Sequence, residues 1–370
     1  MALVAVRHSG YNFPNSKYGY WIMNAADNLT VSAPLFRQVT RRRAIALSAV
    51  AAGVAAAPFL FKLGMGGDLR EIVWHGTTLG APSTIKLYHK DEAVAQKAID
   101  AAREELDRLE AIFSIYRADS VLSRLNMTGR VDHAPVEFMD LLGTALNIAK
   151  LTDGIFDPTI QPLWSLYFNH FMQEKPDPAG PAKSAIQQAM TKIGWQQINI
   201  DAANRRVAFT RPDMALTLNS IGQGYITDRV SDVLRQHGFD SMLIDMGEPR
   251  ALKSRPDGKP WHIGIANPAD PSQAITEVNV RDKCVATSGG YGTLFDDNGK
   301  FTHIINPKTG LTAPALMGVS VIAPNATIGD SLSTAMLLVP AEQRRPLLVA
   351  GGGNKAIFVT PKGVSQIIEA

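Results

Sequence analysis

The chain has 370 residues, of which 45% are hydrophobic and 19% are charged, a mixture that supports a packed core and excludes a wholly disordered chain. A single cysteine, Cys284, excludes an internal disulfide framework and any multi-cysteine zinc or iron–sulfur site. The formal net charge is +3, yet residues 1–67 hold seven of the 37 Lys and Arg and one of the 34 Asp and Glu. The remainder is net acidic, so the basic balance gives no reason to expect a nucleic-acid partner.

The first 67 residues are typical of an export signal. Arg41–Arg43 precede an uncharged, Ala-rich run that ends at Phe61. This run is too short and too weakly apolar for a membrane span of ~20 residues, and it fits the h-region of a signal, here about residues 44–61. Thr40-Arg41-Arg42 resembles the start of a twin-arginine signal, which predicts a periplasmic protein. The alternative is an uncleaved N-terminal anchor facing the periplasm, which would be the only membrane contact.

Residues 68–370 are predicted to form one α+β domain, because strand and helix patterns are mixed without strict alternation and no linker divides them. Alternating polar and apolar residues predict the first strand, and apolar residues at helical spacing predict a helix over Glu92–Phe113. Gly238 is a natural stop for a later helix. The predicted elements, in chain order, are strand Ser83–Tyr88, helices Glu92–Phe113, Phe138–Leu151 and Ala182–Ile193, a hairpin of Asn199–Asp201 with Arg206–Thr210, helix Tyr225–Gln236, strands Ser241–Met246, Trp261–Ile265, Phe301–Ile305 and Met317–Ala323, and helix Gly329–Leu338.

Several common catalytic motifs are absent from the sequence. It contains no P-loop, no G-x-S-x-G nucleophile turn and no H-E-x-x-H zinc motif. Gly222-Gln-Gly224 begins like a dinucleotide-binding fingerprint but lacks the third glycine, and it lies far from the N-terminal position of a Rossmann unit. These absences exclude the best-marked nucleotide, hydrolase and metalloprotease sites.

A carboxylate and a hydroxyl share one side of a predicted helix. Asp330 and Thr334 are four residues apart at its start, so they lie one turn apart on one face. Both offer hard oxygen atoms, and Mg²⁺ takes one or two such protein ligands, with water and phosphate oxygens completing its shell. Taken alone, the pair is also explained by a helix-capping aspartate beside a buried threonine.

Three further segments each have a functional and an ordinary explanation. The Gly-rich turn Thr217–Gly224 opens a helix, so its N–H groups could bind an anion and its carbonyls a cation, or it is a plain strand-to-helix turn. His303 is predicted on a strand that ends at Asn306-Pro307. Its reference pKa is near neutral, which suits a functional group, but a histidine on a strand can also be simply half-buried. Gly154–Asp157 ends one helix and caps the next segment, or it contributes to a site.

Taken together, these segments resemble the ApbE family of Mg²⁺-dependent FAD:protein FMN transferases. The order of the motifs is more specific than any one of them, and it extends from about residue 74 to 340. The matching segments are Gly76–Gly80, Phe113–Asn126, Thr152–Thr159, Leu218–Asp228, Met246–Glu248, Trp261–Pro268, Ala286–Gly289, His303–Gly310 and Asp330–Ala335.

The resemblance implies roles for individual residues. It implies that Mg²⁺ is held by Asp330, Ser333, Thr334 and the backbone carbonyl at Ser220, and that His303 assists catalysis. The residues implied to contact FAD are Leu79, Tyr116, Ile155, Phe156, Asp157, Thr217, Gln223, Glu248 and Ile305. The sequence departs from the family pattern at several positions. Thr217 stands where the family often has aspartate, Gln223 where it often has lysine, Met246 where it has glycine, and Leu79-Gly80-Ala81 replaces Met-Gly-Thr.

The activity that the resemblance implies is transfer of FMN from FAD to a Thr or Ser hydroxyl of an acceptor protein, with release of AMP. Members with twin-arginine leaders are similar to the NosX-like flavin transferases of nitrous oxide reduction, which implies an exported or membrane-anchored, NosR-like flavoprotein as the acceptor. The changes at Thr217 and Gln223 leave two alternatives open. One is a periplasmic FAD carrier without activity, and the other is a FAD pyrophosphatase that releases FMN and AMP.

Overall fold

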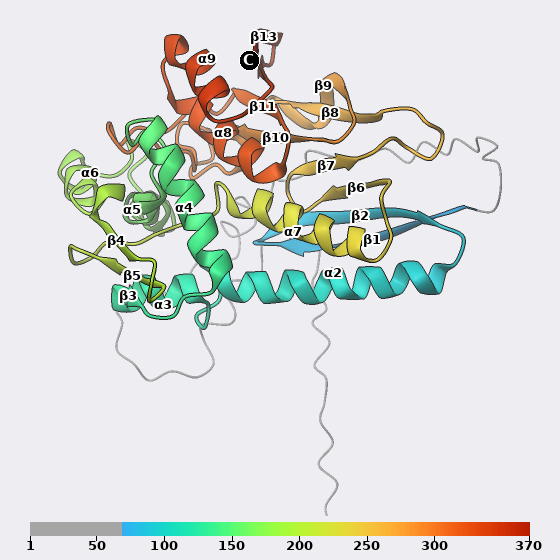
Figure 1. Cartoon of the computed structure of the whole chain (residues 1–370). Coiled ribbons are helices and arrows are strands. Elements are labelled where there is room, and N and C mark those ends of the chain that lie inside the picture. Colours follow the sequence, from blue (N-terminus) through green and yellow to red (C-terminus); the bar gives the residue numbers. More distant parts are fainter. Residues whose placement is uncertain (1–68) are drawn as a thin grey trace, which may run out of the picture.

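The computed structural model describes residues 69–370. The predicted export signal, residues 1–67, lies outside this range. Within residues 69–370, no helix has both the length and the apolar composition needed to cross a bilayer. Helices and antiparallel strands are mixed (Figure 1), so the α+β prediction is confirmed.

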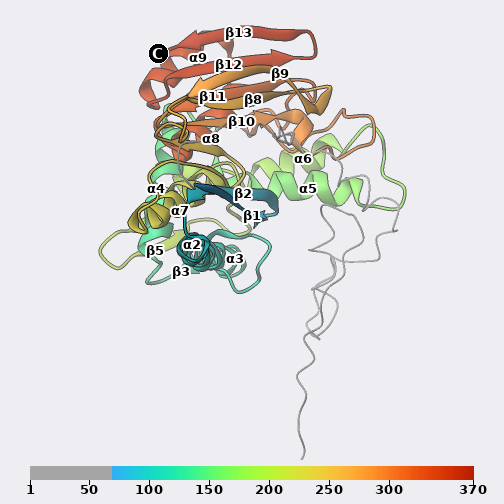
Figure 2. The same cartoon turned by 90° about the vertical axis from the view of Figure 1, so that its right-hand side faces the viewer.

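The largest sheet has eight strands, and each hydrogen-bonded pair of neighbours in it is antiparallel. Its strands come from both ends of the described chain, and the sheet appears edge-on as a twisted stack in Figure 2. The strand order is β1 (Arg70–Thr78), β2 (Ala81–His89), β6 (Met242–Asp245), β7 (Pro249–Leu252), β10 (Lys283–Gly289), β11 (Gly318–Ala323), β12 (Lys355–Thr360) and β13 (Gly363–Glu369).

Two smaller sheets accompany it. One has three strands in the order β3 (Arg130–Val131), β5 (Arg206–Phe209) and β4 (Ile198–Asp201), and the other pairs β8 (Trp261–Asn267) with β9 (Asp270–Val280). The hairpin predicted from the sequence is the β4–β5 pair.

Helices α2, α7 and α8 form a layer against the large sheet. Helix α8 packs on β10 and β11, α7 packs on α8, and α2 packs on α7 (Figure 1). The helices are α2 (Glu92–Phe113), α3 (Val121–Thr128), α4 (Val136–Leu151), α5 (Gln161–Phe171), α6 (Lys183–Met190), α7 (Gly222–Gln236), α8 (Ala326–Leu338) and α9 (Ala341–Ala350), with short 3-10 turns η1 (Pro158–Ile160), η2 (Trp195–Gln197) and η3 (Gly290–Gly292).

Helix α2 shows how the sequence sets these elements. Asp91 caps it by accepting a hydrogen bond from the Ala93 N–H, and the helix ends at Phe113, so both predicted ends are confirmed. Its buried residues recur every three or four positions, which produces one apolar face toward the core. These residues are Ala95, Ala98, Ile99, Ala102, Leu106, Leu109, Ile112 and Phe113.

Helix α8 is buried on nearly all sides, because it lies between α7 and the sheet. It begins at Ala326, three residues earlier than predicted, and Asn325 caps it by accepting a hydrogen bond from the Ile328 N–H. The alternative in which Asp330 caps the helix is therefore wrong. Asp330 lies one turn inside the helix.

The predicted strand Phe301–Ile305 is also wrong. The segment is irregular and makes only the isolated bridges Leu294–Thr302 and Ile305–Thr312 within the described chain. Thr302 and Ile304 are buried alternately as in a strand, but they are covered by neighbouring loops rather than by a continuous ladder. The segment still makes backbone hydrogen bonds to the loops on either side, since the His303 N–H donates to the Thr293 carbonyl at 3.1 Å and the Ala313 N–H to the Ile304 carbonyl at 2.7 Å.

Helices α7 and α8 approach most closely at Gly224. A Cβ atom at this position would lie 2.3 Å from the Ala326 carbonyl oxygen and 2.9 Å from Cβ of Asp330. Only glycine leaves room for this crossing. The same residue donates its N–H to Asp330 Oδ2 at 2.9 Å, so close packing and a hydrogen bond coincide.

We expect Gly224→Ala to lower the free energy of unfolding by about 1–3 kcal/mol, because the added methyl overpacks a rigid backbone contact. The matched control is Gly143→Ala in α4, where an added Cβ meets no atom within 4 Å. That control should be neutral or stabilising by about 1 kcal/mol, since alanine favours a helix. Urea unfolding measures both, and equal midpoints for Gly224→Ala and the unmodified protein would contradict the packing argument.

Candidate functional site

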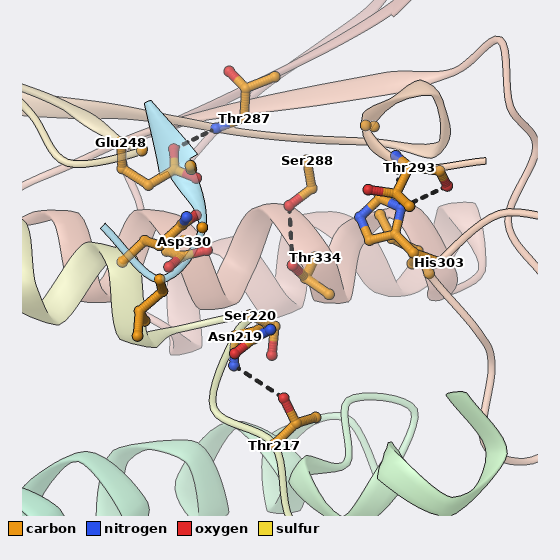
Figure 3. A pocket seen from close by; sticks show the side chains of 18 of the residues that line it. Thr217, Asn219, Ser220, Glu248, Thr287, Ser288, Thr293, His303, Asp330 and Thr334 are labelled. Atoms are coloured by element: carbon orange, nitrogen blue, oxygen red, sulfur yellow. Dashed lines mark hydrogen bonds between the residues drawn. The ribbon is translucent and has the colours of Figure 1, made fainter. Parts of the chain in front are cut away.

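A cavity of about 700 Å³ opens between the large sheet, the helical layer and the β8–β9 pair. Its walls come from the β1–β2 turn, the loop after α2, the segment before η1, α5, the turn before α7, the β6–β7 connection, β8, β10, η3, residues 303–307 and α8. Figure 3 shows side chains from several of these elements converging on one space. Segments far apart in the sequence therefore build one site.

The fold brings together every sequence-predicted site residue except one. Those that line the cavity are Leu79, Tyr116, Ile155, Phe156, Asp157, Thr217, Ser220, Gln223, Glu248, His303, Ile305, Asp330 and Thr334. Ser333 is fully buried behind the wall, where its hydroxyl lies 2.7 Å from Ser288 Oγ and donates to the Asp330 carbonyl at 2.9 Å. It supports the lining residues rather than forming part of the surface.

Asp330 and Thr334 both face the cavity from α8, as their spacing predicted (Figure 3). One oxygen of Asp330, Oδ2, accepts the Gly224 N–H at 2.9 Å. The Thr334 hydroxyl lies 2.9 Å from Ser288 Oγ on β10. Each side chain is thereby oriented by a neighbouring element while it retains oxygen lone pairs for a ligand.

The turn before α7 presents a second set of oxygen atoms. Thr217 Oγ1 accepts the Asn219 N–H at 3.3 Å, and Asn219 Nδ2 donates to the Tyr116 hydroxyl at 2.9 Å. The other polar atom of that amide, Asn219 Oδ1, is buried and has no hydrogen-bond partner within the described chain. A buried carbonyl oxygen left unpaired at a cavity wall is open to a ligand. Asn219 was not singled out from the sequence, although it lies inside the turn motif.

Glu248 is buried at the opposite wall, beside Asp330 (Figure 3). Its Oε2 accepts the Thr287 N–H at 2.9 Å. Asp245 accepts the N–H of Gly247, which has φ 111° and turns the chain between the two acids. Gln223 packs against this turn and donates to the Thr78 carbonyl at 3.3 Å.

Burial makes these carboxyl groups weaker acids than exposed Asp and Glu side chains. It raises the pKa of Asp330 to about 7, with the negative charge of Asp228 adding to the effect and the Gly224 N–H opposing it. The pKa of Glu248 rises well above its usual value through burial first and then through Asp330, and burial raises that of Asp245 to about 6. Ionising all three together is costly without a nearby positive charge.

The carboxylate of Asp157 accepts hydrogen bonds from its own segment and from a neighbouring one. It caps η1 by accepting the N–H and the hydroxyl of Thr159 at 2.8 and 2.6 Å, and it accepts the Trp195 N–H at 3.0 Å. The capping role considered from the sequence is thus present, at a position that also lines the cavity. Burial raises its pKa in opposition to these hydrogen bonds.

His303 lies at the end of the cavity away from Glu248 (Figure 3). Its Nδ1 lies 3.1 Å from the Thr293 carbonyl oxygen and 3.2 Å from the Thr293 nitrogen. Burial lowers the pKa of the imidazole to about 4, rather than leaving it near neutrality, so the ring is uncharged at pH 7. With Nδ1 occupied by Thr293, Nε2 is the ring nitrogen that a substrate could meet.

An aromatic wall from α5 completes the cavity. Trp164 and Phe168 stack with ring centroids 5.0 Å apart and an interplanar angle of 13°, and Met172 lies one turn further on. Helix α5 was not predicted from the sequence, although its aromatic residues recur at helical spacing. Such a surface suits a flat ring system.

The donor set favours a hard cation over a transition metal. Within the described residues, no group of three or more His, Cys, Asp or Glu side chains is arranged to hold a metal ion. The available atoms are carboxylate, hydroxyl and carbonyl oxygens, and the described residues that line the cavity include four acids but no lysine or arginine. Oxygen-rich sites with few protein ligands are typical of Mg²⁺.

Comparisons with known proteins agree with this picture. The FAD:protein FMN transferase of Haemophilus influenzae is 28% identical over 307 residues, covering 79% of this chain and 87% of that protein. The protein of the same name from Treponema pallidum is 30% identical over 323 residues, covering 79% and 85%. The crystal structure of the Pseudomonas stutzeri flavinyl transferase ApbE in its apo form aligns with a TM-score of 0.67 and 27% identity, over 82% of this chain and 94% of that one.

The family model described as the ApbE family matches residues 79–358, which span the cavity and most of the helical layer. This match confirms the resemblance inferred from the order of the sequence motifs. The chain belongs to the ApbE family.

Proposed function

We propose that this protein is a Mg²⁺-dependent transferase that moves FMN from FAD to a Thr or Ser hydroxyl of an acceptor protein and releases AMP. One observation carries the proposal. The cavity has room for a nucleotide and an aromatic wall, yet the described residues that line it include four acids and no lysine or arginine. A cation held among these acids would offset the charge of a bound diphosphate.

The residues present fit a magnesium ion. Asp330, Thr334 and Ser220 all line the cavity, where Asp330 would supply a carboxylate, Thr334 a hydroxyl and Ser220 the backbone carbonyl that the family resemblance implies. Asn219 Oδ1, buried and unpaired, adds an oxygen atom beside Ser220. When bound, Mg²⁺ would neutralise the two phosphates and favour departure of AMP.

The transfer itself forms one bond and breaks one bond. The acceptor hydroxyl oxygen bonds to the phosphorus of the FMN half, and the bond from that phosphorus to the bridging oxygen breaks, so that AMP leaves with the electron pair. The proton of the hydroxyl must pass to a base. His303 is neutral at pH 7, and its Nε2 can take that proton in the tautomer in which Nδ1 carries the hydrogen and donates it to the Thr293 carbonyl.

The acceptor and the location are inferred from the leader. The twin-arginine pattern at Thr40-Arg41-Arg42 supports export to the periplasm. An exported acceptor follows, and a NosR-like, membrane-anchored electron-transfer flavoprotein of nitrous oxide reduction is our candidate.

We expect Asp330→Ala to lower FMN transfer at least 100-fold, because the carboxylate at the cation position is removed. The assay incubates the exported domain with FAD, Mg²⁺ and an acceptor peptide containing Thr, and it measures the gain in peptide mass and the AMP released. The control is Asp132→Ala, an exposed ion-pair residue outside the cavity, which should retain full activity.

Three outcomes of the same assay distinguish the candidate functions. A covalent gain in peptide mass supports the transferase. FMN and AMP released without a peptide indicate a pyrophosphatase, and tight FAD binding with no product indicates a carrier. Full transfer by Asp330→Ala would remove the metal assignment.

We expect His303→Gln to lower kcat by roughly 10²–10⁴-fold, the usual loss when a general base is removed. The half-saturating Mg²⁺ concentration should stay the same, because His303 is not one of the proposed Mg²⁺ ligands. Steady-state kinetics at varied Mg²⁺ and FAD measure both quantities. An unchanged kcat would assign the proton transfer to another group.

The raised pKa of Asp330 predicts how stability depends on pH. In the unfolded chain this group has the ordinary aspartate pKa of 3.8, and in the folded, metal-free protein burial raises its pKa to about 7. The folded state therefore holds the proton more tightly, so stability is greatest at low pH and falls as pH rises from about 4 to 7. Asp330→Asn, which cannot ionise, should lose this part of the pH dependence.

Thermal unfolding between pH 5 and 8 measures the effect. Without metal, we expect Tm of the unmodified protein to fall relative to Asp330→Asn by roughly 2–4 °C for each kcal/mol lost. Addition of 10 mM Mg²⁺ at pH 8 should raise Tm of the unmodified protein and leave Asp330→Asn unchanged. Parallel pH profiles for the two proteins would show that Asp330 does not ionise in this range.

A further inference from the structure

Asp228 lies on α7, one turn beyond Gly224, and its carboxylate meets the first turn of α8. Oδ1 accepts the Ala326 N–H at 2.8 Å, and Oδ2 accepts the Thr327 N–H at 2.9 Å and the Thr327 hydroxyl at 2.6 Å. Arg250 on β7 donates to Oδ1 from its Nη1. A single side chain therefore connects α7, α8 and β7.

Each of these three elements carries part of the site. The N-terminal turn of α7 begins beside Ser220 and contains Gln223, α8 carries Asp330 and Thr334, and Glu248 directly precedes β7. Asp228 itself does not line the cavity. Besides the effect of its charge on the pKa of Asp330, it can influence the site through the relative positions of the elements that it joins.

The contacts of Asp228 and Gly224 fix α8 at two points along α7. Gly224 sets the distance between the helices through its contact with the Ala326 carbonyl. Asp228 satisfies two N–H groups that would otherwise be unpaired at the start of α8, and its negative charge lies where the helix dipole is positive. These two contacts together leave α8 little freedom to slide or rotate on α7.

The ion pair with Arg250 makes the arrangement dependent on charge. Their side chains are only 15% and 12% exposed, and Arg250 Nε is buried without a hydrogen-bond partner in the described chain. Loss of the carboxylate charge would leave a mostly buried guanidinium without an ionic partner. The strand that follows Glu248 and the helix that carries Asp330 would then no longer be connected through this ion pair.

We propose that Asp228 is a positioning residue, which holds α8 against α7 and β7 so that Asp330, Thr334 and the turn at Ser220 present their oxygen atoms to one cation. This inference rests on the proposed function, since it assigns Asp228 a role in forming the magnesium site. Its direct consequence is a change in Mg²⁺ affinity rather than in the chemical step.

The test compares Asp228→Asn with Asp91→Asn. Both replace a helix-capping aspartate by an isosteric, uncharged residue, but Asp91 caps α2, which contributes no residue to the cavity wall. Mg²⁺ alone is titrated into each metal-free protein and followed by calorimetry and by the rise in Tm. FMN transfer is then measured at varied Mg²⁺.

We expect Asp228→Asn to weaken Mg²⁺ binding by roughly tenfold, with kcat at saturating Mg²⁺ reduced less than threefold, whereas Asp91→Asn binds Mg²⁺ like the unmodified protein. If Asp228→Asn folds poorly, the double variant Asp228→Asn with Arg250→Met removes the unpaired charge and should show the same weakened binding. Unchanged Mg²⁺ affinity in either Asp228 variant would overturn the positioning role.

The unmodified protein separates this inference from the proposed function. If it binds no Mg²⁺ and transfers no FMN, there is no ion to position, and both the function and the role of Asp228 are wrong. If it binds Mg²⁺ and transfers FMN while Asp228→Asn binds equally well, the proposed function stands and only the positioning role fails.

Discussion

The site depends on one contact between two helices, in which the Gly224 amide donates to the Asp330 carboxylate across the α7–α8 crossing. The crossing is close because position 224 has no side chain. It orients a carboxylate that burial drives toward the neutral form, and the N–H partly opposes that shift. It also places the turn at Ser220 opposite α8, so that oxygen atoms more than a hundred residues apart in sequence lie around one space.

Much of this arrangement follows from the sequence, because local patterns determine the elements. The apolar spacing and the Asp91 cap define α2 at both ends. The i, i+4 spacing of Asp330 and Thr334 is sufficient to place both on one side of α8, whatever the exact start of that helix. The ordered motifs then indicate which elements meet, and the family match agrees with them.

The rest could not be predicted, because it arises from contacts between distant segments. Thr302 and Ile304 are buried as they would be in a strand, but the segment forms only isolated bridges and no continuous ladder. No local sequence pattern indicates that Asn219 Oδ1 is unpaired. Likewise, none indicates the hydrogen bond between Asp228 and Ala326, which are 98 residues apart. The uncharged state of His303 likewise depends on how tertiary packing excludes water from the ring.

The acidic character of the cavity also couples its two proposed ligands. Because no lysine or arginine lines the described walls, a divalent ion would supply the positive charge that offsets the phosphates of the nucleotide, and the ion in turn would gain phosphate oxygens. Thermodynamic reciprocity then requires each to tighten the other by the same factor. The occupancy of the enzyme would follow the product of the two concentrations, so a compartment poor in divalent ions would keep it empty even when flavin is abundant.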